Sequence, residues 1–238
     1  MFDFVLYTHT DCKDVWPIFF GQTKKYEKNL NKVIFVNKKD DDIPSDYKVV
    51  LYDDTKVYRE RLLNCLNQIE TDYMLFQHED MFLYKNAQWD KILSYKRIMM
   101  DNNIDIIKLI RGGNEVGQNF SLENPELKVI TKDFPYIFAI QPSLFKTDSF
   151  VNIVTHSKGD NIWQFEIGAQ KACRDLNIKA LYVDDGGIKR GKAHWDSNIY
   201  PYVATAVVKG KWNMSEYKNE LTKLLNDYEI SHKNRGAR

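Results

Sequence analysis

The sequence predicts an α/β protein with a mixed but largely parallel central sheet flanked by helices. Short apolar runs typical of strands alternate with amphipathic stretches typical of helices in the first 110 residues, and the second half mixes the two without this alternation. A chain of 238 residues with 43% hydrophobic residues is long enough to bury the core of one such domain. We therefore expect a single domain over residues 1–230 and a frayed, disordered tail over 231–238.

The first half of the chain supplies most of the expected sheet. Short runs of β-branched and aromatic residues predict strands, and apolar residues that recur every three or four positions predict helices. In chain order we expect strand 2–8, helix 14–26, strand 32–37, strand 49–52, a helix after Asp53-Asp54, a strand within 71–84, helix 89–102 and an apolar run over 104–110.

The second half is less regular. Residues 111–126 are rich in Gly, Asn and Glu, which predicts a long functional or mobile loop. In chain order we then expect strands 128–131 and 136–141, a turn at Pro142, helix 162–176, strand 179–183, a basic loop over 185–192 and helix 214–230.

Charge, cysteines and hydropathy exclude several classes of protein. The formal net charge of +1 gives no global field that would attract nucleic acid, so we expect no nucleic-acid partner. The widely spaced Cys12, Cys65 and Cys173 fit a reducing, cytoplasmic compartment without a disulfide framework. The first residues lack a basic segment and no window reaches 18 uninterrupted apolar residues, so we expect neither signal peptide nor transmembrane segment.

The most informative segment is the acidic cluster His78-Glu79-Asp80, which lies between two apolar runs. Because carboxylates are rarely buried without a partner, water, a cation or a ligand should reach it. Ligands of such sheets bind beyond the carboxyl ends of the strands, where Thr8-His9 should also lie. Carboxylates with few other protein ligands suit Mg²⁺ or Mn²⁺ bound to the phosphates of a nucleotide. Alternatively, Glu79 and Asp80 cap the next segment or pair with a Lys or Arg.

Several segments together resemble a known family. A first strand ending in a short polar turn, a helix containing Arg59 and Arg61, and then "TDYMLFQHEDMFL" look like the Rossmann-like GT-A fold of nucleotide-sugar-dependent glycosyltransferases. The segments "FQHEDMFL", "NIWQFE" and "HWDSNIYPYV" are similar to small viral and bacterial glycosyltransferases, among them a chlorella-virus sugar transferase. The resemblance implies transfer of a sugar from a UDP- or GDP-sugar donor to a hydroxyl of a glycan or other acceptor, assisted by Mn²⁺ or Mg²⁺.

The resemblance also implies where the donor and the metal bind. An Asp-x-Asp motif holds the metal in this family, and here His78 replaces its first acid, which leaves Asp80 as the metal ligand with Glu79 beside it. His78 then either donates a hydrogen bond to the ribose or diphosphate or has a structural role. Asp53 either holds the base or ribose or caps the next helix, and Arg61 either approaches the nucleotide or faces solvent. The nucleotide-binding candidates outside the acidic cluster are Thr8, His9 and Thr10 at the end of the first strand, Asp53, and Arg61 at the start of the following helix.

A transferase that inverts the anomeric centre needs a base for the acceptor hydroxyl, and "GDNIWQFE" supplies two carboxylates. Glu166 is flanked by Phe165 and Ile167, which should raise its pKa and improve it as a base, with Asp160 in reserve. Trp163 is placed to stack on a sugar face. The alternative for Glu166 is an ordinary surface salt bridge.

A basic segment near the C-terminus completes the expected site. Lys189, Arg190 and Lys192 could neutralise the leaving diphosphate, and His194 could provide a further contact to the metal or diphosphate. The segment 185–192 either closes over the substrate or is an ordinary basic loop. Two other functions stay open: a nucleotidyltransferase that releases pyrophosphate, and a module that binds a nucleotide sugar without turnover.

Overall fold

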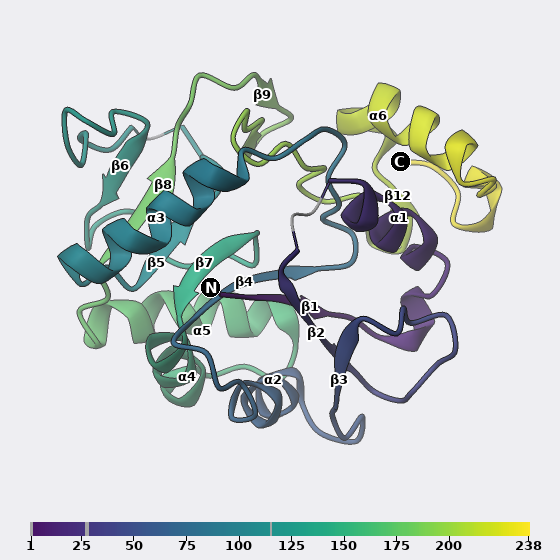
Figure 1. Cartoon of the computed structure of the whole chain (residues 1–238), viewed down its shortest axis with the longest axis horizontal. Helices are drawn as coiled ribbons and strands as arrows, with labels where there is room; N and C mark the ends of the chain where they lie inside the picture. Colours follow the sequence, from purple (N-terminus) through teal and green to yellow (C-terminus); the bar gives the residue numbers. More distant parts are fainter. Residues whose placement is uncertain (1, 27–28, 115) are drawn as a thin grey trace.

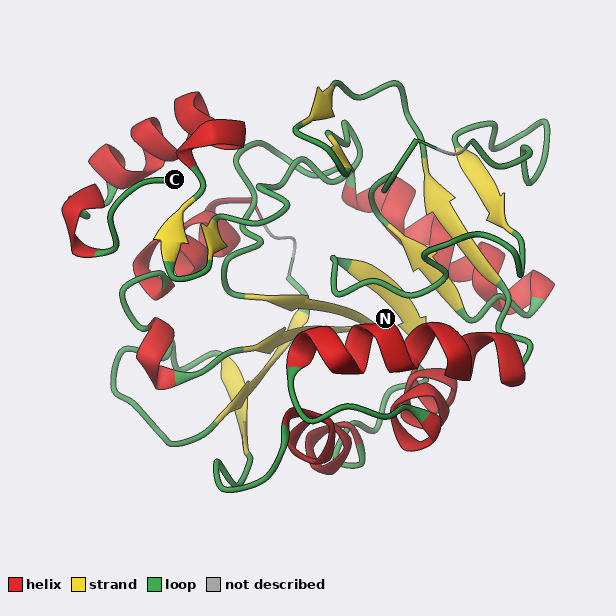
Figure 2. Ribbon diagram, turned by 180° about the vertical axis from the view of Figure 1, so that it is seen from behind, coloured by secondary structure: helices red, strands yellow, loops and turns green. Residues whose placement is uncertain are grey.

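A computed structural model describes residues 2–26, 29–114 and 116–238. Its centre is an eight-stranded sheet with helices on both faces (Figures 1 and 2), which confirms the predicted α/β class. Position 115, within the loop expected over 111–126, is not among the described residues. None of the helices in the described ranges combines the length and apolarity that crossing a membrane requires.

The sheet is mixed and mostly parallel, as predicted. Its strand order is β3-β2-β1-β4-β7-β5-β8-β6, in which β6 and β7 run against their neighbours. The strands are β1 (Asp3–Tyr7), β2 (Asn31–Val36), β3 (Tyr47–Leu51), β4 (Tyr73–His78), β5 (Ile106–Lys108), β6 (Leu127–Ile130), β7 (Ser143–Lys146) and β8 (Ala180–Val183).

Helices cover both faces of the sheet because alternate residues of the central strands are apolar in both directions. Phe4 of β1 packs against Phe19 and Trp89 on one face, whereas Phe76 of β4 packs against Phe150 on the other. Accordingly, α3 and α5 lie on opposite sides of the sheet (Figures 1 and 2). The helices are α1 (Trp16–Tyr26), α2 (Tyr58–Leu66), α3 (Trp89–Asn102), α4 (Thr147–His156), α5 (Ile162–Asp175) and α6 (Met214–Asp227).

The prediction of a strand over 136–141 is wrong. These residues form turns and bends, and the strand that enters the sheet is β7, followed by α4, neither of which the sequence analysis identified. The reason lies in the backbone partners: the Gln170 side chain bonds both the N–H and the carbonyl of Phe138, and the Glu166 carboxylate accepts the N–H of Ile140. Because α5 satisfies this backbone, the segment is buried without joining the sheet.

The central strands β1 and β4 lie side by side and define the site. The chain leaves β1 through α1 to reach β2 on one side, while β4 pairs on the other side. This reversal is the topological switch point at which ligands of open α/β sheets bind. Tyr7 and His78 are paired across the two strands, so Thr8-His9 and Glu79-Asp80 emerge at the same edge, as expected.

Two short hairpins and the C-terminus border this edge. The hairpins are β9 (Lys189–Arg190) with β10 (His194–Trp195), and β11 (Val207–Val208) with β12 (Lys211–Trp212). Residues 231–238, which we expected to be frayed, contain a short 3₁₀ helix at His232–Asn234 and then run parallel to β12 through a bridge between Trp212 and Ala237.

Candidate functional site

Two adjoining cavities open at the carboxyl ends of β1 and β4. The first has a volume of about 530 Å³ and the second about 730 Å³. Cys12, His78, Glu79 and Ile162 line both, so the end of β4 forms the wall between them. The acidic cluster His78-Glu79-Asp80 therefore lies where the two cavities adjoin.

The first cavity has aromatic walls. Tyr7 stacks on Tyr52 with ring centroids 5.2 Å apart and on His78 at 5.1 Å, and Tyr58 meets Tyr7 edge-on. The α2 helix contributes Tyr58 and Arg61 to the lining. Flat rings with polar groups at their edges suit a planar heterocycle such as a nucleotide base.

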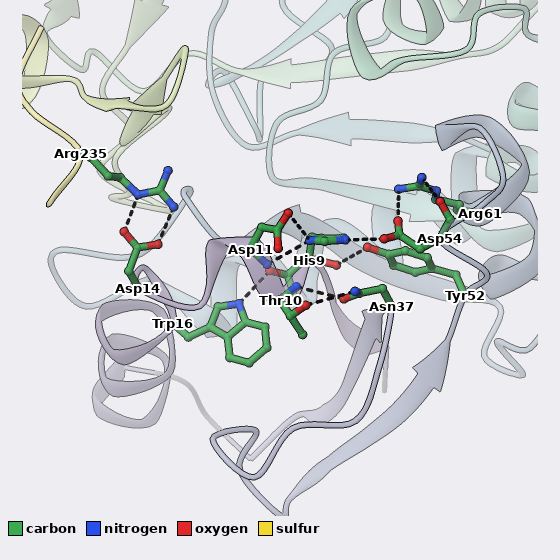
Figure 3. A network of polar contacts seen from close by, with 11 residues as sticks. His9, Thr10, Asp11, Asp14, Trp16, Asn37, Tyr52, Asp54, Arg61 and Arg235 are labelled. Atoms are coloured by element: carbon green, nitrogen blue, oxygen red, sulfur yellow. Dashed lines mark hydrogen bonds and ion pairs between the residues drawn. The ribbon is translucent and has the colours of Figure 1, made fainter.

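Polar contacts fix the rim of the first cavity (Figure 3). His9 Nε2 lies 2.8 Å from an Asp54 carboxylate oxygen, and Arg61 donates to the same carboxylate at 2.7 Å and to the Asp54 carbonyl. The Thr10 N–H donates to the Asn37 side chain. Of the expected nucleotide-binding residues, Thr8, His9 and Arg61 line this cavity.

Asp53 and Thr10 have other contacts. The Asp53 carboxylate accepts hydrogen bonds from the backbone N–H and hydroxyl of Thr55, which closes a turn before α2. The helix cap itself is Val57, so Asp53 does not cap α2. Neither Asp53 nor Thr10 is among the described residues that line the two cavities.

The three residues of the acidic cluster are in different environments. His78 is buried, its Nε2 lies 3.1 Å from the Tyr58 hydroxyl, and burial lowers its pKa to about 3, so the imidazole is neutral. Burial raises the pKa of Glu79, while hydrogen bonds from the Cys12 thiol and Thr8 oppose the rise. Burial and the neighbouring Glu79 raise the pKa of Asp80 to about 7.

The second cavity contains the expected base. Glu166 lies on its wall, accepts the Ile140 N–H at 2.8 Å, and has a pKa raised by burial. Lys108 lies close enough to oppose that shift, and burial lowers the pKa of Lys108 itself to about 8. Trp163 lines the same cavity with its side chain largely exposed, at 68%. Ile167 is exposed, so the apolar surroundings of Glu166 come from the cavity wall rather than from this neighbour.

The remaining predicted site residues lie in different parts of the structure. Asp160 is exposed at the rim of the first cavity. His194 lines the second cavity, where its Nδ1 lies 3.9 Å from a Glu216 carboxylate oxygen. Arg190 points elsewhere, since it donates to Asp196 at 2.9 Å and to Glu220 at 2.6 Å.

Lys189, the neighbour of Arg190, donates to Asn114 at 2.6 Å. Neither Lys189 nor Arg190 is found among the described residues that line the cavities. Of this basic segment, Lys192 lies at the second cavity.

The chain offers few protein ligands at Asp80 for the expected divalent cation. Within the described part of the chain, no group of three His, Cys, Asp or Glu side chains is arranged to hold a metal ion. His78 is neutral and bonded to Tyr58, and Glu79 already accepts the Cys12 thiol. A guanidinium, that of Arg235, also lies near enough to both carboxylates to lower their pKa values. A cation at this point could be held only through Glu79, Asp80, water and the phosphates of a bound donor.

Cys12, Lys108 and Arg235 are among the lining residues that were not predicted from the sequence. Cys12 lies at the end of the short 3₁₀ helix after β1, and Lys108 interrupts an apolar run, so both carried a signal in the sequence. Arg235 carried none, because only the tertiary fold brings residues 231–238 to the second cavity.

Comparisons with known proteins identify the fold. No family model and no curated protein matches the sequence. The chain is similar to residues 1–349 of S. aureus TarS with a TM-score of 0.54 at 12% identity, covering 98% of this chain and 68% of that one. The same TarS fragment in complex with UDP gives 0.53 at 13% identity, covering 99% and 68%.

The longer S. aureus TarS structure gives a TM-score of 0.53 at 14% identity, covering 98% of this chain and 41% of TarS. At these identities the likeness concerns the fold alone. It supports the predicted GT-A-like architecture, while the resemblance to a chlorella-virus transferase stays a prediction.

Proposed function

We propose that this protein is a glycosyltransferase that moves a sugar from a nucleotide-sugar donor to an acceptor hydroxyl. The observation that carries the proposal is the pair of adjoining cavities at the switch point: one has aromatic walls suited to a base, and the other holds a carboxylate with a raised pKa. The structure of TarS with bound UDP, on the same fold, supports a uridine nucleotide as the first donor to test.

The second cavity has the groups that an inverting transfer needs. The acceptor oxygen attacks the anomeric carbon, the bond from that carbon to the diphosphate breaks, and the nucleoside diphosphate leaves with the bonding electrons. The acceptor proton passes to Glu166, whose raised pKa suits a base near neutral pH. Trp163, exposed at this cavity, offers a flat face on which a sugar ring packs.

A thermal-shift panel with product analysis tests the proposal. A donor that binds only the folded protein stabilises it by about 2.7 kcal/mol at 100 times its Kd, which raises the melting temperature by roughly 5–10 °C. We expect a UDP- or GDP-sugar to give this shift and to release nucleoside diphosphate when an acceptor is added. Release of pyrophosphate instead would identify a nucleotidyltransferase, and a shift without any turnover would identify a binding module. No shift with any nucleotide would refute the proposal.

A further inference from the structure

In addition to Lys108 of β5, three segments bring positive charge to the second cavity, which Asp80 also lines. Arg235 comes from the C-terminal residues, Lys192 from the β9–β10 hairpin, and Lys209 from the β11–β12 hairpin. Lys209 lies in a tight two-residue hairpin turn, in which Lys209 and Gly210 both adopt positive φ angles, 52° and 76°.

Arg235 is the most firmly held of these cations. Two of its guanidinium nitrogens donate to the two oxygens of Asp14, both at 2.5 Å, and the third nitrogen points away from Asp14 (Figure 3). The group also packs over the Trp212 ring at 6.0 Å, and the Arg235 side chain is only 16% exposed. Its charge opposes the rise in the pKa values of Glu79 and Asp80, which places it near the end of β4.

We propose that Arg235, with Lys192 and Lys209, binds the donor diphosphate at this edge and stabilises it as the leaving group without a divalent cation. The inference rests on the proposed transferase function. The planar guanidinium of Arg235 matches phosphate oxygens, and fixed positive groups stabilise the charge that develops as the bond between the sugar and the diphosphate breaks. In this proposal Arg235, Lys192 and Lys209 supply the positive charge that a metal ion bound to a complete Asp-x-Asp motif would supply.

Calorimetric titration of the chelated protein tests this inference. The full chain in EDTA is titrated with UDP and GDP and, separately, with uridine and guanosine, and the titrations are repeated with added Mn²⁺. We expect the wild type to bind a nucleoside diphosphate equally well with and without Mn²⁺. Arg235→Gln should weaken diphosphate binding by about 10- to 100-fold, as expected for a lost charged hydrogen bond, and leave nucleoside binding unchanged.

Matched variants separate binding from folding. Arg235→Lys keeps the charge and should lose less affinity than Arg235→Gln. Arg174→Gln removes a guanidinium on α5 that donates to the Lys132 and Phe134 carbonyls, and it should leave both affinities unchanged.

Two results would overturn the inference while leaving the transferase proposal intact: diphosphate binding that needs Mn²⁺, or an Arg235→Gln variant that weakens nucleoside and diphosphate binding equally. If the wild type binds no nucleotide under any condition, the proposed function fails with it.

Discussion

His78 illustrates how one buried side chain sets the chemistry of this edge. Where the resemblance to GT-A glycosyltransferases predicts an acid, this chain has an imidazole that stacks on Tyr7 and lies 3.1 Å from the Tyr58 hydroxyl. The alternation of side chains along β4 puts it on the same face as Phe76, toward α2 and α4. A buried, neutral His at this position forms part of the wall between the two cavities and adds no negative charge that would attract a metal ion.

The buried state of His78 predicts a specific dependence of stability on pH. Its pKa is about 3 in the folded protein and about 6.5 when unfolded, so the unfolded chain binds the proton more tightly. The contribution of His78 to the free energy of unfolding is therefore fully present above about pH 6.5 and is lost as the pH falls toward 3. Between pH 8 and pH 5 this loss amounts to about 2 kcal/mol.

Urea unfolding of the wild type and of His78→Gln at these two pH values measures this effect. Glu79 and Asp80, whose pKa values are raised, act in the opposite direction in both proteins, so only the difference between the two is diagnostic. The wild type should lose about 2 kcal/mol more than the variant. Equal losses would show that His78 is protonated in the folded state.

Glu166 gives the sharpest catalytic prediction at this scale. Glu166→Gln keeps an oxygen that accepts the Ile140 N–H but removes the basic carboxylate. We expect transfer to fall by about 10²- to 10⁴-fold, the contribution typical of a positioned base, with donor binding unchanged. Steady-state rates and a donor titration measure the two effects. Glu70→Gln is the control, because it changes an exposed glutamate that is not among the described residues lining the two cavities. Transfer that survives in Glu166→Gln would exclude this assignment.

At the scale of elements, what the sequence could predict depended on where each backbone finds its hydrogen-bond partners. The strands β1, β2 and β4 are apolar runs paired on both sides, so pattern alone located β1 and β2 within one residue and placed β4 within 71–84. The apolar run over 136–141 has the same composition, but side chains of α5 bond its backbone instead. No local pattern distinguishes these two outcomes, because the deciding partner lies about 30 residues further along the chain.

The same reasoning explains which parts of the candidate site were found. The positions of Thr8 and His78 could be predicted, because they lie at the ends of neighbouring parallel strands, which a parallel sheet brings together at one edge. Arg190 was misplaced because the sequence shows its charge and not its partners, and in the fold Asp196 and Glu220 hold it away from the cavities. Arg235 was missed because its position depends on contacts that close the whole chain.

At the scale of the whole molecule, the two ends of the chain meet around the site. Arg235 bonds Asp14 across 221 positions, and Tyr228 donates to Gln22 of α1 across 206. The residues after α6 also bond Trp212 on both sides, through the carbonyl of Gly236 and the N–H of Arg238. Such contacts make the C-terminal segment part of the cavity wall rather than an appendage.

Removal of residues 231–238 tests that integration. The truncated chain loses the paired Arg235–Asp14 contact and both backbone bonds to Trp212, and the cost should be about 1–3 kcal/mol because the pair is bidentate and mostly shielded from water. For a chain of this size the melting temperature should fall by roughly 2–10 °C. Asp14→Asn in the full chain, which breaks the ion pair and keeps the backbone bonds, should show a smaller fall. A frayed segment, as composition alone implied, would leave the melting temperature of the truncated protein unchanged.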